Sequence, residues 1–294
     1  MKKILLFGST GFIGKNLSNY FKLSKKYLLL TPSKIECNLL DLSQVKKVVK
    51  ETQPDFIINT AYFGGVSSKI IYSDENIFNN IKLVINILRA SVNSKQLKKI
   101  ILFGSGLEYD NSSLSIKETD QIKPKNIYAT IKSITSLLSI GLAQELKLPL
   151  VLIRPFNLYG PNDKKSVIFY LINSILKNRD FVLTKGEQVR DYLYIDDFTK
   201  IIYKIIDNYQ KFEDLEIYNA SSGKLTQLKT IFKIIFKLCN FEEKYTIIKN
   251  SENEYWHQVA NIKKIKRLIS INKLTSLENG LKNTLDWIKK NYES

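Results

Sequence analysis

The sequence is poor in the residues that form disulfides and bind transition metals. Its 294 residues include two cysteines, Cys37 and Cys239, and one histidine, His257. The cysteines are widely separated and form no CxxC pattern, which argues against a disulfide framework or a cysteine metal site. A single histidine excludes most histidine-based catalysis, so we expect no metal site and interpret His257 as structural or as a minor ligand contact.

Long apolar runs are missing as well. No stretch reaches the ~20 apolar residues that a membrane-spanning helix needs, and the apolar residues 4–7 are too few for the core of a signal peptide. Because cysteine is scarce, a reducing cytoplasm fits, and we predict a cytoplasmic protein with no membrane partner. A content of 44% hydrophobic and 11% aromatic residues excludes a disordered chain.

Negative charge is scarce relative to positive charge, since 28 Asp+Glu face 45 Lys+Arg and leave a net charge of +17. Arginine supplies only a few of these basic residues, and the lysines form scattered pairs such as Lys46-Lys47. Proteins that read nucleic acids tend to concentrate arginine and interleave it with aromatic residues. We therefore interpret the surplus as a lysine-rich solvated surface and expect no nucleic-acid partner, with attraction for an anionic small substrate as the alternative.

Short apolar segments alternate with amphipathic ones through the first half of the chain. The predicted strands are residues 3–7, 27–30, 56–58, 100–103 and 150–153, and the predicted helices between them are 12–22, 42–52, 77–92 and 128–146. Strands that are apolar throughout and separated by helices indicate a parallel sheet that is covered on both faces. The fold class is therefore α/β with a doubly wound parallel (Rossmann) sheet.

The pattern changes after residue 155. Longer loops appear, and helices at 167–177 and 228–238 alternate with short strands. We expect a dinucleotide-binding domain over 1–155, rejoined by about 187–210, and a smaller C-terminal α/β lobe over 156–294 that mostly binds substrate.

A glycine-rich turn, GSTGFIG at residues 8–14, follows the first predicted strand and opens the first predicted helix. Gly8 permits the tight turn, Gly11 lets a pyrophosphate approach the backbone, and Gly14 allows the helix to pack closely on the strand. The N-terminus of the helix then offers free N–H groups to phosphates. In this βαβ context the pattern predicts a dinucleotide site.

Tyr128 and Lys132 are four residues apart, on one face of a predicted helix. A nearby ammonium group lowers the pKa of a phenol and makes proton exchange feasible. Ser105 follows the fourth predicted strand, at the sheet edge where open α/β sheets bind ligands, and can donate a hydrogen bond to a substrate oxygen. These three residues form the predicted catalytic set.

This combination resembles the extended short-chain dehydrogenase/reductase family of the NAD-dependent epimerase/dehydratase type. The GxxGxxG turn and the Ser…YxxxK set match that family, as do RPFNLYGP at 154–161, VRDYLYIDD at 189–197 and the C-terminal SLENGL at 276–281. The resemblance implies that Arg190 meets a nucleotide diphosphate and that Asn157 lines the sugar or phosphate pocket. The expected substrate contacts are Ser105, Gly106, Leu107, Asn157 and Arg190.

The cofactor is expected to be NADPH, with NAD as a possibility. No acidic residue ends the second predicted strand, where one would hold the ribose 2′-hydroxyl of NAD. Ser33 and Lys34 follow instead, and they would attract a 2′-phosphate. The expected cofactor contacts are Gly8, Thr10, Gly11, Phe12, Ile13, Gly14, Ser33, Lys34, Asn38, Leu39, Ala61, Tyr128 and Lys132.

Within the family, CNLLD at 37–41 and GGV at 64–66 look most like the GDP-L-fucose synthase branch. That branch epimerises C3 and C5 of a 4-keto-6-deoxy sugar with a cysteine and a histidine and then reduces C4. Leu107 stands at the cysteine position and Ser166 is the nearest match to the histidine, so we expect only the C4 reduction to remain. The sugar would be GDP-linked, a hexose or a heptose, and would serve surface-polysaccharide biosynthesis.

The motifs leave three other functions to consider. A UDP-sugar 4-epimerase needs only the catalytic set and a retained NAD. A 4,6-dehydratase is disfavoured because Gly106 and Leu107 replace its Asp-Glu pair. A non-catalytic nucleotide-sugar-binding protein is disfavoured because the catalytic set is complete. Relatives often pair as homodimers through the equivalents of helices 77–92 and 128–146, and apolar residues at Ile131, Ile134, Leu137 and Leu138 are compatible with that assembly.

Overall fold

The computed structural model of the protein describes residues 1–64, 72–110, 114–242, 245–249, 255–271 and 273–292. Its central feature is a six-stranded parallel sheet in the order β10-β5-β4-β3-β1-β2. The strands are β1 (Lys2–Phe7), β2 (Tyr27–Leu30), β3 (Phe56–Asn59), β4 (Lys99–Phe103), β5 (Leu150–Pro155) and β10 (Glu216–Ala220). The predicted doubly wound α/β fold class is confirmed.

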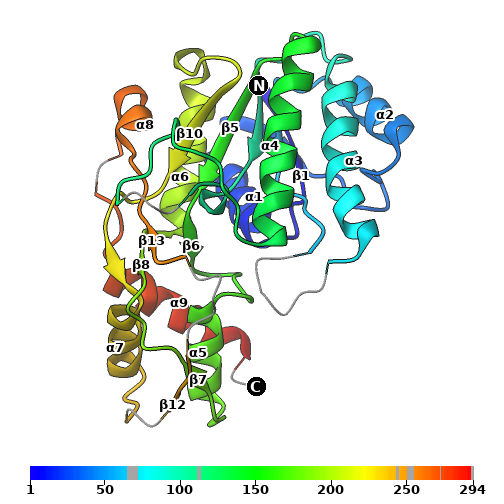
Figure 1. Cartoon of the computed structure of the whole chain (residues 1–294). Helices are drawn as coiled ribbons and strands as arrows, with labels where there is room; N and C mark the ends of the chain where they lie inside the picture. Colours follow the sequence, from blue (N-terminus) through cyan, green and yellow to red (C-terminus); the bar gives the residue numbers. More distant parts are fainter. Residues whose placement is uncertain (65–71, 111–113, 243–244, 250–254, 272, 293–294) are drawn as a thin grey trace.

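Helices cover both faces of this sheet (Figure 1). On one face lie α1 (Phe12–Ser24) and α6 (Ile195–Asp207), and on the other lie α2 (Leu42–Thr52), α3 (Asp74–Ser91) and α4 (Ile127–Glu145). Successive side chains of a strand point to opposite faces, so Ile4 of β1 packs in the core cluster under α1 and α6, whereas Leu5 packs in the cluster under α2 and α3. The central residues of β1, β3, β4 and β5 are apolar because both faces of these strands are buried.

Most of the remaining elements form a smaller part of the molecule below the sheet in Figure 1, while α8 (Lys263–Leu268) lies beside β10. The helices of this smaller part are α5 (Val167–Leu176), α7 (Leu228–Leu238) and α9 (Leu277–Tyr292). Its short strands are β6 (Asn157–Tyr159), β7 (Val182–Leu183), β8 (Val189–Arg190), β9 (Tyr192–Tyr194), β11 (Thr226–Gln227), β12 (Thr246–Ile247) and β13 (His257–Gln258). Strand β8 pairs with both β11 and β13, and helices α5, α7 and α9 pack on one another.

The chain crosses between the two parts more than once. After entering the smaller part at β6 it returns as α6 under the sheet and as the edge strand β10. Two short 3₁₀ helices, η1 (Gly106–Glu108) and η2 (Tyr209–Lys211), complete the connections. In the described part of the chain, no helix has both the length and the apolar character to cross a membrane.

The order of the strands indicates at which end of the sheet a ligand binds. Strand β1 lies between β2 and β3, and the connections on its two sides run over opposite faces through α1 and α2. Open α/β sheets bind ligands at such a switch point, beyond the carboxyl ends of the strands. The glycine-rich turn after β1, Tyr62 after β3 and Ser105 after β4 all lie at this edge.

Candidate active site

The glycine-rich turn needs two of its glycines for its own geometry. Gly8 has a φ of +78°, and a Cβ there would lie 2.4 Å from the backbone nitrogen of Ala61. A Cβ at Gly14 would lie 2.1 Å from the Gly8 oxygen, so only glycine allows α1 to pack this closely on the turn. A Cβ at Gly11 would meet the Gly8 oxygen at 3.6 Å, an ordinary contact. Gly11 is therefore not required by the packing of the turn.

The N-terminus of α1 faces the cavity beside this turn. Its N-cap is Gly11, which has no side chain to cap the first N–H groups, and Thr10, Gly11, Phe12 and Ile13 all line the cavity. Uncapped N–H groups and the positive end of the helix dipole favour an anion. These residues fit the pyrophosphate of a dinucleotide cofactor.

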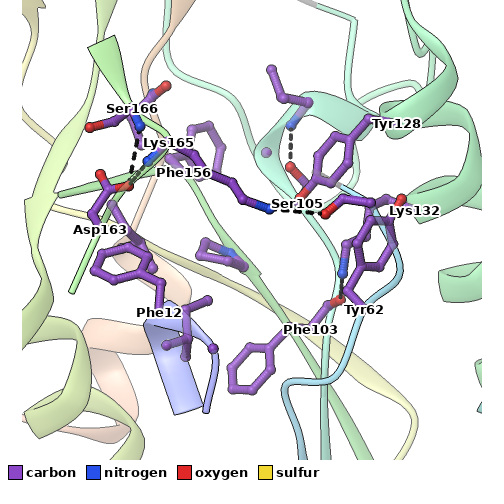
Figure 2. A pocket seen from close by; sticks show the side chains of 18 of the residues that line it. Phe12, Tyr62, Phe103, Ser105, Tyr128, Lys132, Phe156, Asp163, Lys165 and Ser166 are labelled. Carbon is purple, nitrogen blue, oxygen red and sulfur yellow. Dashed lines mark hydrogen bonds between the residues drawn. The ribbon is translucent and has the colours of Figure 1, made fainter. Parts of the chain in front are cut away.

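The predicted catalytic residues come together on one side of the cavity (Figure 2). Tyr128 and Lys132 lie on the first turns of α4, which Asn126 begins by accepting a hydrogen bond from the Ala129 N–H at 2.9 Å. Lys132 Nζ donates to the Phe103 carbonyl at 2.9 Å and lies 4.6 Å from the centre of the Tyr62 ring. The Tyr62 and Tyr128 rings meet edge to face at 5.4 Å.

Burial sets the electrostatics of this group. Burial lowers the pKa of Lys132 to about 8, although the Glu108 carboxylate opposes the shift. Burial also raises the pKa of Tyr128 above its ordinary value, and a hydrogen bond to Ser105 works in the opposite direction. A neutral phenol beside an ammonium group that titrates near pH 8 can donate a proton and can stabilise the phenolate that remains.

A buried ion pair lies directly beneath Ser105. Glu108 Oε1 accepts hydrogen bonds from the Ser105 N–H at 2.7 Å and from Ser136 Oγ at 2.9 Å. Glu108 Oε2 accepts from Arg154 Nε at 2.9 Å, and the guanidinium lies 4.4 Å from the centre of the Tyr109 ring. This carboxylate fastens the Ser105 turn to α4 and β5, a role that the sequence analysis missed.

The opposite wall of the cavity comes from the smaller part of the molecule (Figure 2). The buried Asp163 accepts the backbone N–H groups of Lys165 and Ser166 at 3.0 and 3.2 Å, and burial raises the pKa of its carboxyl. Ser166 Oγ accepts the Phe169 N–H at 3.2 Å and so caps α5. Lys165 Nζ donates to the Gly64 carbonyl at 3.4 Å and links the two walls.

The cavity between these walls has a volume of about 950 Å³. It reaches Arg190 on β8 and Asn157 on β6, whose Nδ2 donates to the Asp191 carbonyl at 3.2 Å. The predicted site residues that line it are Thr10, Gly11, Phe12, Ile13, Ala61, Ser105, Gly106, Leu107, Tyr128, Lys132, Asn157 and Arg190. Tyr62 lines it as well, and its place just after the third strand is the signal by which the sequence could have identified it.

Ser33 and Lys34, in the loop after β2, are not among the residues that line the cavity. Ser33 and Lys34 are exposed, and the Ser33 N–H donates to Glu36 Oε2 at 2.7 Å. Glu36 was not among the predicted site residues because it lies beyond the end of β2, and the acidic residue that holds the ribose of NAD is expected at that end. This carboxylate lies in the turn where a 2′-phosphate was expected, and it would repel one.

Two further residues predicted to contact the cofactor have local roles. Asn38 Oδ1 accepts the Leu40 N–H at 3.1 Å, and the Leu39 carbonyl accepts Asn86 Nδ2 at 2.9 Å. The residues Gly65 and Val66, which contributed to the resemblance with one branch, lie outside the described residues.

Comparison with known proteins identifies the family. The sequence profile of the NAD dependent epimerase/dehydratase family matches residues 4–221, which is more than half of the chain. The chain belongs to the NAD-dependent epimerase/dehydratase family. Its recognition as an extended short-chain dehydrogenase/reductase is thereby confirmed, and so is its assignment as an enzyme of the NAD(P)-dependent oxidoreductase type.

Individual members of the NAD-dependent epimerase/dehydratase family resemble the chain at low identity. A GDP-L-colitose synthase of Yersinia pseudotuberculosis is 27% identical over 82% of this chain and 83% of its own length. A GDP-L-fucose synthase of Dictyostelium discoideum is 22% identical over 100% of this chain and 97% of its own length. A solved UDP-glucuronic acid 4-epimerase from Bacillus cereus, in complex with UDP-glucuronic acid and NAD, superposes with a TM-score of 0.89 at 22% identity, covering 99% of this chain and 100% of its own.

Proposed function

We propose that this enzyme is an NADPH-dependent 4-ketoreductase of a nucleotide-activated 4-keto-6-deoxy sugar, a GDP-linked hexose or heptose. The observation that carries the proposal is that Ser105, Tyr128 and Lys132 line one cavity (Figure 2). The aliphatic Leu107 lines the same cavity. The similarity to a GDP-L-colitose synthase and a GDP-L-fucose synthase supports a GDP-linked substrate.

The residues divide the chemistry of the reduction between them. When bound, the reduced nicotinamide supplies the hydride that reaches C4 of the sugar. Tyr128 Oη protonates O4 as the carbonyl becomes an alcohol, and Ser105 Oγ donates a hydrogen bond to the same oxygen. Lys132 stabilises the phenolate that Tyr128 leaves, and Arg190 holds the diphosphate, which adds binding energy remote from the reacting carbon.

We further propose that C3 and C5 are not epimerised. Removing and replacing a proton at these carbons needs an acid and a base on opposite faces of the sugar. The Leu107 side chain can do neither, and the Ser166 hydroxyl is engaged as the cap of α5. Asp163 Oδ1 is likewise committed to two backbone N–H groups of its own loop.

The preference for NADPH rests on the exposed Ser33 and Lys34, and Glu36 opposes it. Lys34→Ala should lower the ratio of kcat/KM for NADPH to that for NADH, and Glu36→Gln should raise it, because a 2′-phosphate is attracted by the cation and repelled by the carboxylate. Equal use of both cofactors by the wild-type enzyme, unchanged in both variants, would show that this loop does not read the 2′ position.

The second candidate is an NAD-dependent nucleotide-sugar 4-epimerase. Glu36 favours it, because a carboxylate in the turn after β2 suits the ribose 2′-hydroxyl of NAD. Such an enzyme would retain NAD on purification and would interconvert UDP-sugars without added NADPH.

A single incubation separates the two candidates. The enzyme is mixed in deuterated water with NADPH and a GDP-4-keto-6-deoxy sugar, and the absorbance at 340 nm and the deuterium content of the product are followed. The proposed reductase oxidises NADPH and leaves C3 and C5 free of solvent deuterium. Deuterium at either carbon would establish epimerisation, and a stable absorbance at 340 nm would contradict the reductase.

We also propose that the enzyme is a cytoplasmic homodimer that pairs through α3 and α4. Phe78 on α3 and Ile134 and Leu137 on α4 are exposed, with 67%, 41% and 58% of their surfaces accessible. Helices α3 and α4 pack side by side, so these apolar side chains can contribute to one interface.

A further inference from the structure

Three polar side chains project from one face of the small sheet that contains β8. Gln188 directly precedes β8, two residues before Arg190, a spacing that in extended backbone places both side chains on the same side. Gln258 on β13 is the direct partner of Arg190 in the parallel pairing of β8 with β13. All three side chains line the cavity.

Two of these side chains carry polar atoms that the protein leaves unused. Gln188 is 3% exposed and Gln258 is 2% exposed. Gln188 Oε1 and Gln258 Nε2 are buried and have no hydrogen-bond partner among the described residues. The other ends of both amides are held, because Gln258 Oε1 accepts from Arg190 Nη1 at 3.2 Å and Gln188 Nε2 donates to Thr184 Oγ1 at 3.4 Å.

Buried polar atoms without partners are uncommon in folded proteins because each loses its hydrogen bonds with water. Here a free acceptor and a free donor lie on one face of one sheet, in the wall of a ligand cavity. A hydroxyl group is the ligand group that suits such a pair, since it can accept from an amide N–H such as that of Gln258 and donate to a carbonyl oxygen such as that of Gln188.

The position of the pair along the cavity indicates which hydroxyl it meets. Gly106, beside Ser105, lies against the Phe156 ring, where a Cβ would come within 2.7 Å of it, and Asn157 follows directly. Asn157 bonds to the Asp191 carbonyl, next to Arg190. Gln188 lies on the other side of Arg190, toward Thr184. The reacting sugar therefore belongs on the Ser105 side of Arg190, and the nucleoside on the Gln188 side.

We propose that Gln188 and Gln258 form a subsite for a ribose hydroxyl of the nucleotide-sugar substrate, so that the enzyme selects ribonucleoside diphosphate carriers through their pentose. This inference rests on the proposed function, because it takes Arg190 as the anchor of the diphosphate. The ribose is the part of a nucleotide that adjoins the α-phosphate, and Gln258 is bonded directly to Arg190.

Titration calorimetry of nucleotide binding tests the proposal without any turnover. GDP and UDP are compared with their 2′,3′-dideoxy forms on the wild-type enzyme. We expect the dideoxy forms to bind about tenfold more weakly, because they leave both amide atoms buried without partners. This comparison needs no variant, so it does not depend on how a mutant folds.

Substitutions of the two glutamines then test whether they cause the difference in affinity between the ribose and dideoxy forms. Gln188→Leu and Gln258→Leu should each reduce the difference between the ribose and dideoxy forms to about twofold or less. Any disturbance of Arg190 in these variants weakens both forms alike and leaves their ratio as the readout. Gln227→Leu is the matched control, because Gln227 of β11 pairs with Val189 and so points to the opposite face of the same sheet.

Other outcomes would overturn the proposal in distinct ways. Equal binding of ribose and dideoxy forms by the wild-type enzyme refutes the ribose subsite and leaves the proposed function intact. Unchanged discrimination in both leucine variants also refutes it. A changed preference for GDP over UDP, with the ribose discrimination preserved, would assign the pair to the base instead. Failure to bind any of the four nucleotides would overturn the proposed function as well.

Discussion

For single residues, the proposed mechanism predicts that the reaction depends on the protonation of Lys132. Burial lowers the pKa of Lys132 to about 8, so its charge is present below that pH and is lost as the pH rises through it. In the proposed mechanism this charge stabilises the Tyr128 phenolate, so kcat/KM should fall on the alkaline side with an apparent pKa near 8. A pH–rate profile measures this directly.

The control for this profile is Lys132→Arg, whose guanidinium remains charged throughout the accessible range. In that variant, whatever its absolute rate, the alkaline fall near pH 8 should disappear. A wild-type profile that stays level to pH 10 would show that Lys132 does not carry the dependence.

Glu108 is the residue on which the local structure beneath Ser105 depends. Glu108→Gln removes the charge that faces Arg154, whose guanidinium is only 1% exposed. Breaking a buried ion pair from one side costs about 3–5 kcal/mol, so the free energy of unfolding should fall by about that amount in urea denaturation.

A matched control for Glu108 lies nearby on the surface. Asp110 pairs with the exposed Lys123 at 3.7 Å, and Asp110→Asn should change the free energy of unfolding by less than about 1 kcal/mol. Equal effects of the two substitutions would contradict a structural role for the buried pair.

Among the structural elements, the turn between β1 and α1 contains two glycines with different predicted roles, Gly14 in packing and Gly11 in ligand binding. Gly14→Ala places a Cβ 2.1 Å from the Gly8 oxygen and should lower the free energy of unfolding by about 1–3 kcal/mol. Gly11→Ala meets only an ordinary contact at 3.6 Å, so its thermal stability should remain near that of the wild type.

The Gly11→Ala variant should instead lose cofactor affinity, because its methyl group blocks the approach of the pyrophosphate to the backbone. Thermal unfolding and cofactor titration of both variants test the assignment. A destabilised Gly11→Ala protein with normal cofactor affinity would reverse the roles given to these glycines.

The elements that the sequence predicts well are those whose pattern is local. Strands such as β1 and β3 carry runs of buried apolar residues, at positions 4–7 and 56–58. Ser73 begins α3 three residues earlier than its apolar face indicates, by accepting the Asn76 N–H at 3.2 Å. Strand β10 is missed because Glu216 and Asn219 make its five residues partly polar, and only its pairing with β5 defines it.

The residues of the candidate site likewise divide into those with a local sequence pattern and those that only the tertiary structure brings together. Tyr128 and Lys132 can be predicted because their spacing lies within one helix. Gln188 and Gln258 cannot be predicted, because only the pairing of β8 with β13 brings together segments that are far apart in the sequence. The role of Glu108 is also tertiary, since it depends on Arg154 of another strand.

At the scale of the whole molecule, the proposed homodimer makes a separate prediction. Leu137→Glu puts a charge on the exposed face of α4 and should convert the dimer to a monomer in sedimentation velocity, because burying an unpaired charge is costly. Leu23→Glu is the control, since Leu23 of α1 is 82% exposed on the opposite face of the sheet. A wild-type protein that sediments as a monomer would refute the dimer.

The proposed reduction requires the new hydrogen at C4 of the sugar to come from the reduced nicotinamide, which Ser105, Tyr128 and Lys132 would hold against the sugar. The most direct measurement uses NADPH deuterated at C4 of the nicotinamide with a GDP-4-keto-6-deoxy sugar, and locates the deuterium in the product by NMR. We expect one deuterium at C4 of the sugar with the wild-type enzyme and no such transfer with Tyr128→Phe. A nucleotide sugar that changes configuration while the deuterium remains on the cofactor would contradict it.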